Sequence, residues 1–328
     1  MSHHIYLYSP SGAVRDKAAF QRGVKRLEAL GHAVEIDPAA LQSHQRFAGD
    51  DAARLAAIGR AAASGADVAL TSRGGYGLTR LLPQLPCKAI AKSIKRGTKW
   101  VGFSDFTALQ LAVLAQTGAR TWAGPALGED FGALSQPGEE GAPDDIMLAC
   151  FDDLLLGQGE GAGWRLPPAP RQSVLASSVA PLPTSTSADF HVPKALLWGG
   201  NLSVLASLLG TPYFPDKKQT RHGVLFLEDV GEHPYRIERL LTQLLHAGVL
   251  ARQQAIVLGQ FTGYQAVPHD RGFKLESVVQ WLRSQLKIPV LTHLPFGHVP
   301  TKVLLPVGAT VSLTVEGREA LLFWGHHH

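Results

Sequence analysis

The sequence has few cysteines, few charged residues and no long hydrophobic segment. Only Cys87 and Cys150 occur among 328 residues, which excludes a disulfide-stabilised scaffold. Charged residues make up 18% of the chain and apolar residues 45%, which excludes an intrinsically disordered protein. No apolar run approaches the roughly 20 residues of a membrane span, and the first residues do not resemble a secretory signal. We therefore expect a cytoplasmic globular protein that does not contact a membrane.

The chain is slightly basic, with a surplus of four positive charges at neutral pH. Its clearest basic segment carries Lys88, Lys92, Lys95 and Lys99, and these spacings predict one basic face of a helix. Such a face is typical of a solvated surface, and the sequence carries no nucleic-acid-binding signature beside it. We therefore expect no nucleic-acid partner.

Short apolar segments alternate with helical patterns in the first half of the chain. The apolar segments predict strands at 5–9, 33–36, 68–72, 99–103 and 121–123. Capping residues and helical periodicity predict helices at 17–30, 50–64, 106–116 and 143–156. This alternation favours an α/β fold, with a mostly parallel sheet covered by helices on both faces.

A stretch rich in Pro, Ser and Ala separates the two halves. Residues 164–193 contain six prolines and predict an extended linker. We therefore expect a first domain at 1–163 and a second at 194–328. In the second, strands are predicted at 195–199, 224–228, 255–260 and 290–294, helices at 201–209, 234–247 and 276–286, and a hairpin at 310–324. This pattern indicates an α+β domain with more antiparallel pairing than the first.

Two loops in the first half follow predicted strands and are candidates for chemistry. Residues 73–77 read Arg-Gly-Gly-Tyr-Gly, and their glycines allow the backbone to approach a ligand closely. This loop is either a tight turn or a cradle for an anion or oxyanion. Ser104 lies in the second loop, where a strand passes directly into a helix. It either caps that helix or acts as a nucleophile beside free helix N–H groups.

A serine nucleophile needs a base, and the base needs an acid that orients it. His298 follows a Pro-Phe-Gly turn, and Glu228 ends an apolar strand, where a buried carboxylate must find a partner. Each residue taken singly is also consistent with a structural role, as a loop histidine and as an ion-pair partner. The sequence has no His-Glu-x-x-His or Cys-x-x-Cys pattern, so we expect no metal site.

Taken together, these segments resemble the LD-carboxypeptidase family, the muramoyltetrapeptide carboxypeptidases of peptidoglycan recycling. The matching stretches occur in the family's order and span most of the chain, at 72–77 with 80–83, 101–109, 198–202, 227–232 with 235–239, and 295–298. The resemblance implies a flavodoxin-like N-terminal domain and a smaller β-rich C-terminal domain, with the active site in the cleft between them.

The resemblance also implies a Ser-His-Glu triad. By motif, Ser104 is the nucleophile, His298 the general base and Glu228 the acid that orients it. The backbone N–H groups of Gly75 and Asp105 are the implied oxyanion hole. The implied reaction hydrolyses the L,D-peptide bond of a murein tetrapeptide or muropeptide and releases the terminal D-alanine. No cofactor is implied, and the protein is expected to form a homodimer.

A carboxypeptidase must bind the free carboxylate of its substrate, which calls for a basic or N–H-rich pocket. Arg73 and Arg236 are candidates for this task, although Arg73 could instead brace the glycine loop. Gly74, Tyr76 and Glu232 are further candidate substrate contacts, and Glu232 could instead hold the start of a helix.

Two other functions stay open at this point. The same family contains microcin C self-immunity peptidases, which use the triad on peptidyl-adenylate analogues and carry an aromatic loop that stacks on the nucleotide. Trp164 or Trp198 could take that stacking role, or each could be a packed core aromatic. The other alternative is a non-catalytic protein that holds a peptide or nucleotide in the cleft. The stretch 164–193 matches no family motif, which leaves the rim of the cleft undefined.

Overall fold

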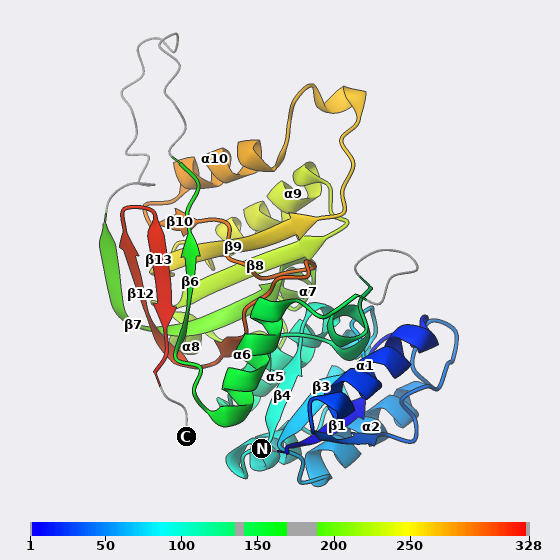
Figure 1. Cartoon of the computed structure of the whole chain (residues 1–328). Coiled ribbons are helices and arrows are strands. Elements are labelled where there is room, and N and C mark those ends of the chain that lie inside the picture. The colour runs from blue at the N-terminus through cyan, green and yellow to red at the C-terminus, as the bar shows by residue number, and fades with distance from the viewer. Residues whose placement is uncertain (1, 135–140, 169–188, 326–328) are drawn as a thin grey trace, which may run out of the picture.

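The computed structural model describes residues 2–134, 141–168 and 189–325, which form two sheets with helices around them (Figure 1). From edge to edge, the first sheet contains β11 (Leu305–Val307), β5 (Thr121–Ala123), β4 (Lys99–Gly102), β3 (Val68–Thr71), β1 (His4–Tyr8) and β2 (Ala33–Ile36). The second contains β10 (Val290–Leu291), β9 (Ala255–Thr262), β8 (Val224–Val230), β7 (Phe190–Asn201), β12 (Thr310–Glu316), β13 (Glu319–Phe323) and β6 (Gly161–Arg165).

The first sheet has the strand order of a flavodoxin-like fold. Strands β2, β1, β3, β4 and β5 are parallel neighbours in that order, which is the 2-1-3-4-5 arrangement of doubly wound sheets. All four residues of β3 are buried, as expected where helices cover both faces. The predicted α/β architecture of this half is therefore confirmed. Its helical segments are α1 (Lys17–Ala29), α2 (Asp51–Ala63), α3 (Leu78–Leu81), η1 (Leu82–Gln84), α4 (Cys87–Lys95), η2 (Ser104–Phe106), α5 (Thr107–Thr117), η3 (Leu127–Phe131) and α6 (Asp145–Leu156).

The second sheet is mixed. Strands β10, β9, β8 and β7 pair in parallel, whereas β7, β12, β13 and β6 pair antiparallel. The predicted terminal hairpin is present as β12 and β13. Figure 1 shows α9 and α10 together beside the parallel part of this sheet. The helical segments of this half are α7 (Leu202–Ser207), α8 (Lys217–Thr220), α9 (Pro234–His246), η4 (Pro268–Asp270) and α10 (Leu275–Gln285).

Strands occupy both ends of the stretch that the sequence predicts to be a linker. Residues 161–165 form β6, which pairs with β13, and β7 begins at Phe190. The interpretation of 164–193 as one extended linker is therefore wrong at its ends, and its middle, 169–188, lies outside the described residues. The cause is long-range pairing: β6 carries only Ala162 and Trp164 as inward apolar residues, and the distant β13 stabilises it.

Two strands also cross the predicted division into domains. β6 spans the expected end of the first domain at residue 163 but belongs to the second sheet, and β11 comes from the second half but pairs antiparallel with β5 in the first sheet.

The basic face predicted for a helix at Lys88, Lys92, Lys95 and Lys99 is shorter than expected. Helix α4 ends at Lys95 and Gly97 adopts a φ of 107°, so Lys99 starts β4 instead of continuing the helix.

The two halves share one continuous apolar core. Helix α5 contacts both α7 and β7 of the second half, and the Thr107 hydroxyl accepts a hydrogen bond of 3.0 Å from the backbone N–H of Asn201. A Cβ on Gly200 would lie 2.4 Å from the Thr107 Oγ1, so only glycine permits this close approach.

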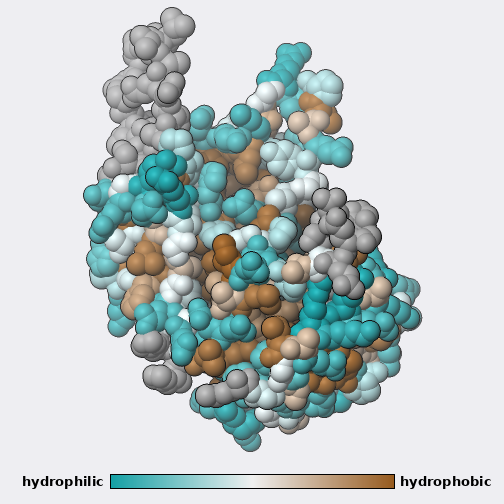
Figure 2. All heavy atoms as spheres, in the orientation of Figure 1, coloured by the Kyte–Doolittle hydropathy of each residue, from teal (hydrophilic) through white to brown (hydrophobic). Residues whose placement is uncertain are grey.

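Figure 2 shows hydrophobic residues interspersed with hydrophilic ones on the viewed face. Every helix within the described ranges is too short or too polar to span a bilayer.

Candidate active site

Ser104 lies where β4 passes into η2, at the carboxyl edge of the first sheet. Its φ is 62°, a left-handed conformation that costs a non-glycine residue about 1–3 kcal/mol. Neither η2 nor α5 has a side-chain cap, so the interpretation of Ser104 as a helix cap is wrong. The hydroxyl instead lies within hydrogen-bonding distance of His298, and a strained strand-to-helix turn is a common position for a nucleophilic serine.

Ser104, His298 and Glu228 form a chain of hydrogen bonds. The His298 Nδ1 lies 2.8 Å from the Glu228 Oε2, and the His298 Nε2 lies 3.1 Å from the Ser104 Oγ. A carboxylate only accepts hydrogen bonds, so Nδ1 carries the proton and Nε2 is free to accept the serine proton. Ser104 follows β4 of the first sheet, whereas Glu228 lies within β8 of the second sheet, near its carboxyl end. The carboxyl ends of parallel strands are where α/β sheets commonly bind ligands.

The surroundings of His298 favour its protonated form. Burial of the ring lowers its pKa, but the hydrogen bond and the charge of Glu228 raise it more, so the pKa of His298 lies above its ordinary value. The ring centre of Phe103 lies 4.8 Å from that of His298. The imidazole is therefore held between an apolar ring and a carboxylate, which is suited to stabilising an imidazolium.

The side chain of Asn201 orients the Glu228 carboxylate. Asn201 Nδ2 donates to the Glu228 Oε1 at 3.2 Å and to the Asp229 Oδ1 at 3.0 Å, and the Glu228 side chain is only 1% exposed. Asn201 falls within the matching stretch 198–202, but no role for it follows from the sequence alone. The feature of the sequence that could have indicated this role is the position of Asn201. It is a polar residue at the end of an apolar strand, and Glu228 is its partner on the neighbouring strand.

The glycine loop lies directly against the nucleophile. A Cβ on Gly74 would be 2.8 Å from the Ser104 Cβ, and Gly75 adopts a φ of 110°. The buried Asp105 carboxylate accepts hydrogen bonds from the Ser11 hydroxyl at 2.7 Å and from the Leu78 amide at 2.9 Å. Burial raises the pKa of Asp105. The Asp105 side chain thus ties the loop after β1 and the residue that follows the glycine loop to the nucleophile turn, a role that does not follow from the sequence alone.

The candidate substrate contacts differ in their surroundings. Arg73 is mostly buried, donates to the Ala13 carbonyl at 3.1 Å and lies 3.9 Å from the Glu129 carboxylate. Tyr76, in contrast, is exposed. Arg236, in the first turn of α9, pairs with Glu232, which precedes the helix; the Arg236 side chain is half-exposed and that of Glu232 is mostly buried. Among the two arginines, only Arg73 belongs to the loop that contacts the nucleophile.

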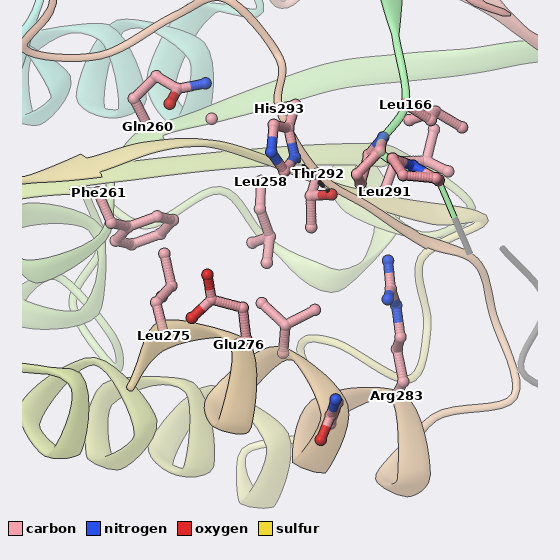
Figure 3. A pocket seen from close by; sticks show the side chains of 15 residues that line it. Leu166, Leu258, Gln260, Phe261, Leu275, Glu276, Arg283, Leu291, Thr292 and His293 are labelled. Atoms are coloured by element: carbon pink, nitrogen blue, oxygen red, sulfur yellow. Dashed lines mark hydrogen bonds between the residues drawn. The ribbon is translucent and has the colours of Figure 1, made fainter. Parts of the chain in front are cut away.

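A cavity of about 490 Å³ adjoins the catalytic candidates. It is lined by Phe103 and His298 together with residues of η3, the start of α6 and the segment 299–302. A second pocket, of about 400 Å³, lies between α10 and β9, where Leu275, Glu276 and Arg283 of the helix point toward the sheet (Figure 3). The second pocket contains none of the three hydrogen-bonded residues. Within the described ranges, His, Cys, Asp and Glu form no group suited to a metal ion.

Comparison with known families identifies both halves of the chain. Residues 5–124 match the LD-carboxypeptidase N-terminal domain, and residues 194–313 match the LD-carboxypeptidase C-terminal domain. The chain belongs to the LD-carboxypeptidase family. The murein tetrapeptide carboxypeptidase of Pseudomonas aeruginosa is 32% identical, over 74% of this chain and 70% of that protein.

Solved structures of the family share the fold. The muramoyltetrapeptide carboxypeptidase of Oxalobacter formigenes superposes with a TM-score of 0.81 at 34% identity, over 99% of both chains. The microcin C7 self immunity protein MccF, in complex with aspartyl sulfamoyl adenosine, gives a TM-score of 0.79 at 24% identity, over 98% of this chain and 96% of that one. The similarity to MccF shows a shared fold only.

The two tryptophans considered for nucleotide stacking are packed aromatics in this member of the LD-carboxypeptidase family. Trp198 is fully buried and its Nε1 donates to the Gln253 side chain at 3.0 Å. Trp164 is 7% exposed and donates to the Thr292 carbonyl at 3.0 Å. Neither ring offers a free face to a nucleotide base.

Proposed function

We propose that this protein is a serine LD-carboxypeptidase that releases the terminal D-alanine from murein tetrapeptide in peptidoglycan recycling. The observation that carries the proposal is the chain of hydrogen bonds from Ser104 through His298 to Glu228. The family membership and the murein names of two relatives support the same substrate class. A homodimer and a cytoplasmic location belong to this proposal as further predictions.

The geometry suits a two-step acyl transfer. The Ser104 Oγ attacks the carbonyl carbon of the L-residue while the His298 Nε2 takes its proton, and Glu228 stabilises the imidazolium. In this proposal, the backbone N–H groups of Gly75 and Asp105 donate to the oxyanion. His298 then gives the proton to the leaving D-alanine nitrogen as the C–N bond breaks. Water, deprotonated by His298, next attacks the acyl-serine, and its hydrolysis releases the tripeptide and restores the hydroxyl.

Arg73 is our choice for the cation that binds the terminal carboxylate. Burial lowers the pKa of Arg73, Glu129 raises it, and the nearby Arg15 and Arg46 lower it. An anion bound beside Arg73 would offset the repulsion between these guanidinium groups. Arg236 fits the task less well, because its ion pair with Glu232 is closer than that of Arg73 with Glu129, and because it lies outside the loop that contacts the nucleophile.

The alternative functions receive less support from the site. A microcin C-type immunity peptidase would share the triad, and the likeness to MccF favours that fold, but Trp164 and Trp198 are packed away from solvent. A non-catalytic binding protein would not need a serine in a strained conformation within hydrogen-bonding distance of a histidine.

The test is mass spectrometry of L-Ala-γ-D-Glu-meso-diaminopimelate-D-Ala after incubation with the protein. We expect loss of one alanine, and we expect Ser104→Ala to lower turnover by at least about a thousandfold without unfolding the protein. Ser207→Ala is the matched control, because Ser207 is exposed on α7 and donates only to its own helix. Near-normal cleavage by Ser104→Ala would refute the assignment of the nucleophile. No cleavage by the wild-type protein would refute the substrate.

A further inference from the structure

The cavity beside His298 combines apolar walls with an uneven set of charges. Met147, Val299 and Pro300 supply apolar surface, and Phe103 and His298 form the wall nearest the nucleophile. Three carboxylates and one ammonium group also line it. Its volume of about 490 Å³ is large enough for one amino-acid side chain with surrounding water.

Most of these charges are already committed to partners within the protein. The Lys302 ammonium pairs with the Asp130 carboxylate, and both side chains are 2% exposed. The Asp144 carboxylate accepts from the Met147 amide at 3.0 Å, where it caps α6, and from the Thr301 hydroxyl at 2.6 Å. These groups shape the cavity and are not available to a ligand without breaking buried contacts.

Glu129 is the exception. Its side chain is 39% exposed, and the cation nearest to it in the described structure is Arg73, at a loose 3.9 Å. Its negative charge reaches the catalytic centre, since it contributes to the raised pKa of His298. The lining therefore has an excess of negative charge, and the carboxylate of Glu129 is the part of it that a ligand can meet.

We propose that Glu129 is the residue that recognises the third position of the peptide, because it meets the ammonium group of a side chain that enters this cavity. The inference rests on the proposed function and adds a specificity-determining residue to it. The apolar walls accommodate the methylene groups, and Glu129 attracts the ammonium group. A lysine side chain meets both conditions. A diaminopimelate side chain presents the same ammonium group with a carboxylate beside it, whereas a side chain that carries only a carboxylate is repelled.

The same charge separates this protein from one of its structural neighbours. MccF structures hold aspartyl sulfamoyl adenosine and glutamyl sulfamoyl guanosine, whose acyl groups are acidic. A carboxylate at the position of Glu129 disfavours such acyl groups through like-charge repulsion. The sign of the preferred side-chain charge is thus a property that distinguishes the two candidate activities.

The experiment compares kcat/KM for peptides L-Ala-γ-D-Glu-X-D-Ala in which X is L-lysine, Nε-acetyl-L-lysine or L-glutamate. Acetyl-lysine keeps the length of lysine and removes its charge. We expect the lysine peptide to be cleaved about fivefold faster than the acetyl-lysine peptide, the scale of a partly exposed ion pair. We expect the glutamate peptide to be cleaved more slowly than either.

Glu129→Gln then assigns the preference to one residue. This variant should bring the lysine to acetyl-lysine ratio close to one while it still cleaves the acetyl-lysine peptide. Any effect on the pKa of His298 changes both rates together, so the ratio isolates recognition. Glu276→Gln is the matched control, because Glu276 is an exposed carboxylate that lines the other pocket (Figure 3), and its ratio should equal that of the wild type.

The outcomes separate this inference from the function on which it rests. Equal cleavage of the lysine and acetyl-lysine peptides by the wild-type protein would overturn the charge preference and leave the carboxypeptidase activity intact. A preference that survives in Glu129→Gln would overturn the role of Glu129. Cleavage of none of the peptides, including the diaminopimelate form, would overturn the proposed function and this inference together.

Discussion

Replacing Gly74 with alanine tests whether contact between the glycine loop and the nucleophile sets the reaction geometry. A Cβ at this position would lie 2.8 Å from the Ser104 Cβ and 2.9 Å from its Oγ. Carbon atoms pack best about 3.5–4.0 Å apart, so the loop and the nucleophile must separate by about 1 Å. The φ of Gly74 is not positive, so the alanine backbone itself is not strained.

A displacement of this size is costly for catalysis and modest for folding. Misplacing a reacting group by about 1 Å lowers the rate on the order of 100-fold. Overpacking by one methyl group lowers the free energy of unfolding by about 1–3 kcal/mol. We therefore expect kcat/KM for D-alanine release to fall about 100-fold, while thermal unfolding still shows a folded protein at the assay temperature.

Gly59→Ala is the control for this measurement. Gly59 lies within α2, and a Cβ there would meet no atom within 4 Å. Alanine in a helix is favoured over glycine by about 1 kcal/mol, so this variant should be slightly more stable and equally active. Gly74→Ala activity within about threefold of the wild type, in a folded protein, would refute the argument that this contact sets the geometry.

Two further predictions follow from the site. Because the pKa of His298 is raised and the general base must be neutral, kcat/KM should already fall with decreasing pH above the ordinary histidine value of about 6.5. In the pH–rate profile, Glu228→Gln should move this fall to lower pH, and an unmoved profile would contradict the cause assigned to the shift. Asn201→Ala removes the amide donor to the buried Glu228 and should lower the free energy of unfolding by about 1–3 kcal/mol. Urea denaturation measures this change, and an unchanged midpoint would show that Asn201 is not needed to hold the carboxylate.

Much of the fold could be predicted from the sequence because the signals are local. Helix caps such as Asp16 and Asp50, and the periodicity of the apolar residues, predict most helices and strands of the first half. The missed elements depend on distant partners. Strand β6 forms only against β13, and β11 joins a sheet whose other strands lie more than 180 residues earlier in the sequence.

The candidate site likewise contains residues that could be predicted from the sequence and residues that could not. Ser104, Glu228 and His298 stand out in the sequence because each lies next to a strand end or a turn, where polar side chains reach a cleft. The roles of Asn201 and of the Asp105 side chain do not stand out, because each becomes clear only through hydrogen bonds between separate segments.

The sequence by itself determined the alternation of strands and helices, the strand-to-helix turn at Ser104 and the family to which the chain belongs. Only the tertiary structure decided that Ser104 and His298, 194 residues apart, share a hydrogen bond. It also decided that Glu129 lines the adjoining cavity with a partly exposed carboxylate, 3.9 Å from Arg73. The physical reason is that periodicity and capping act within a few residues, whereas reactivity and charge recognition depend on distances that are set when the two halves pack together.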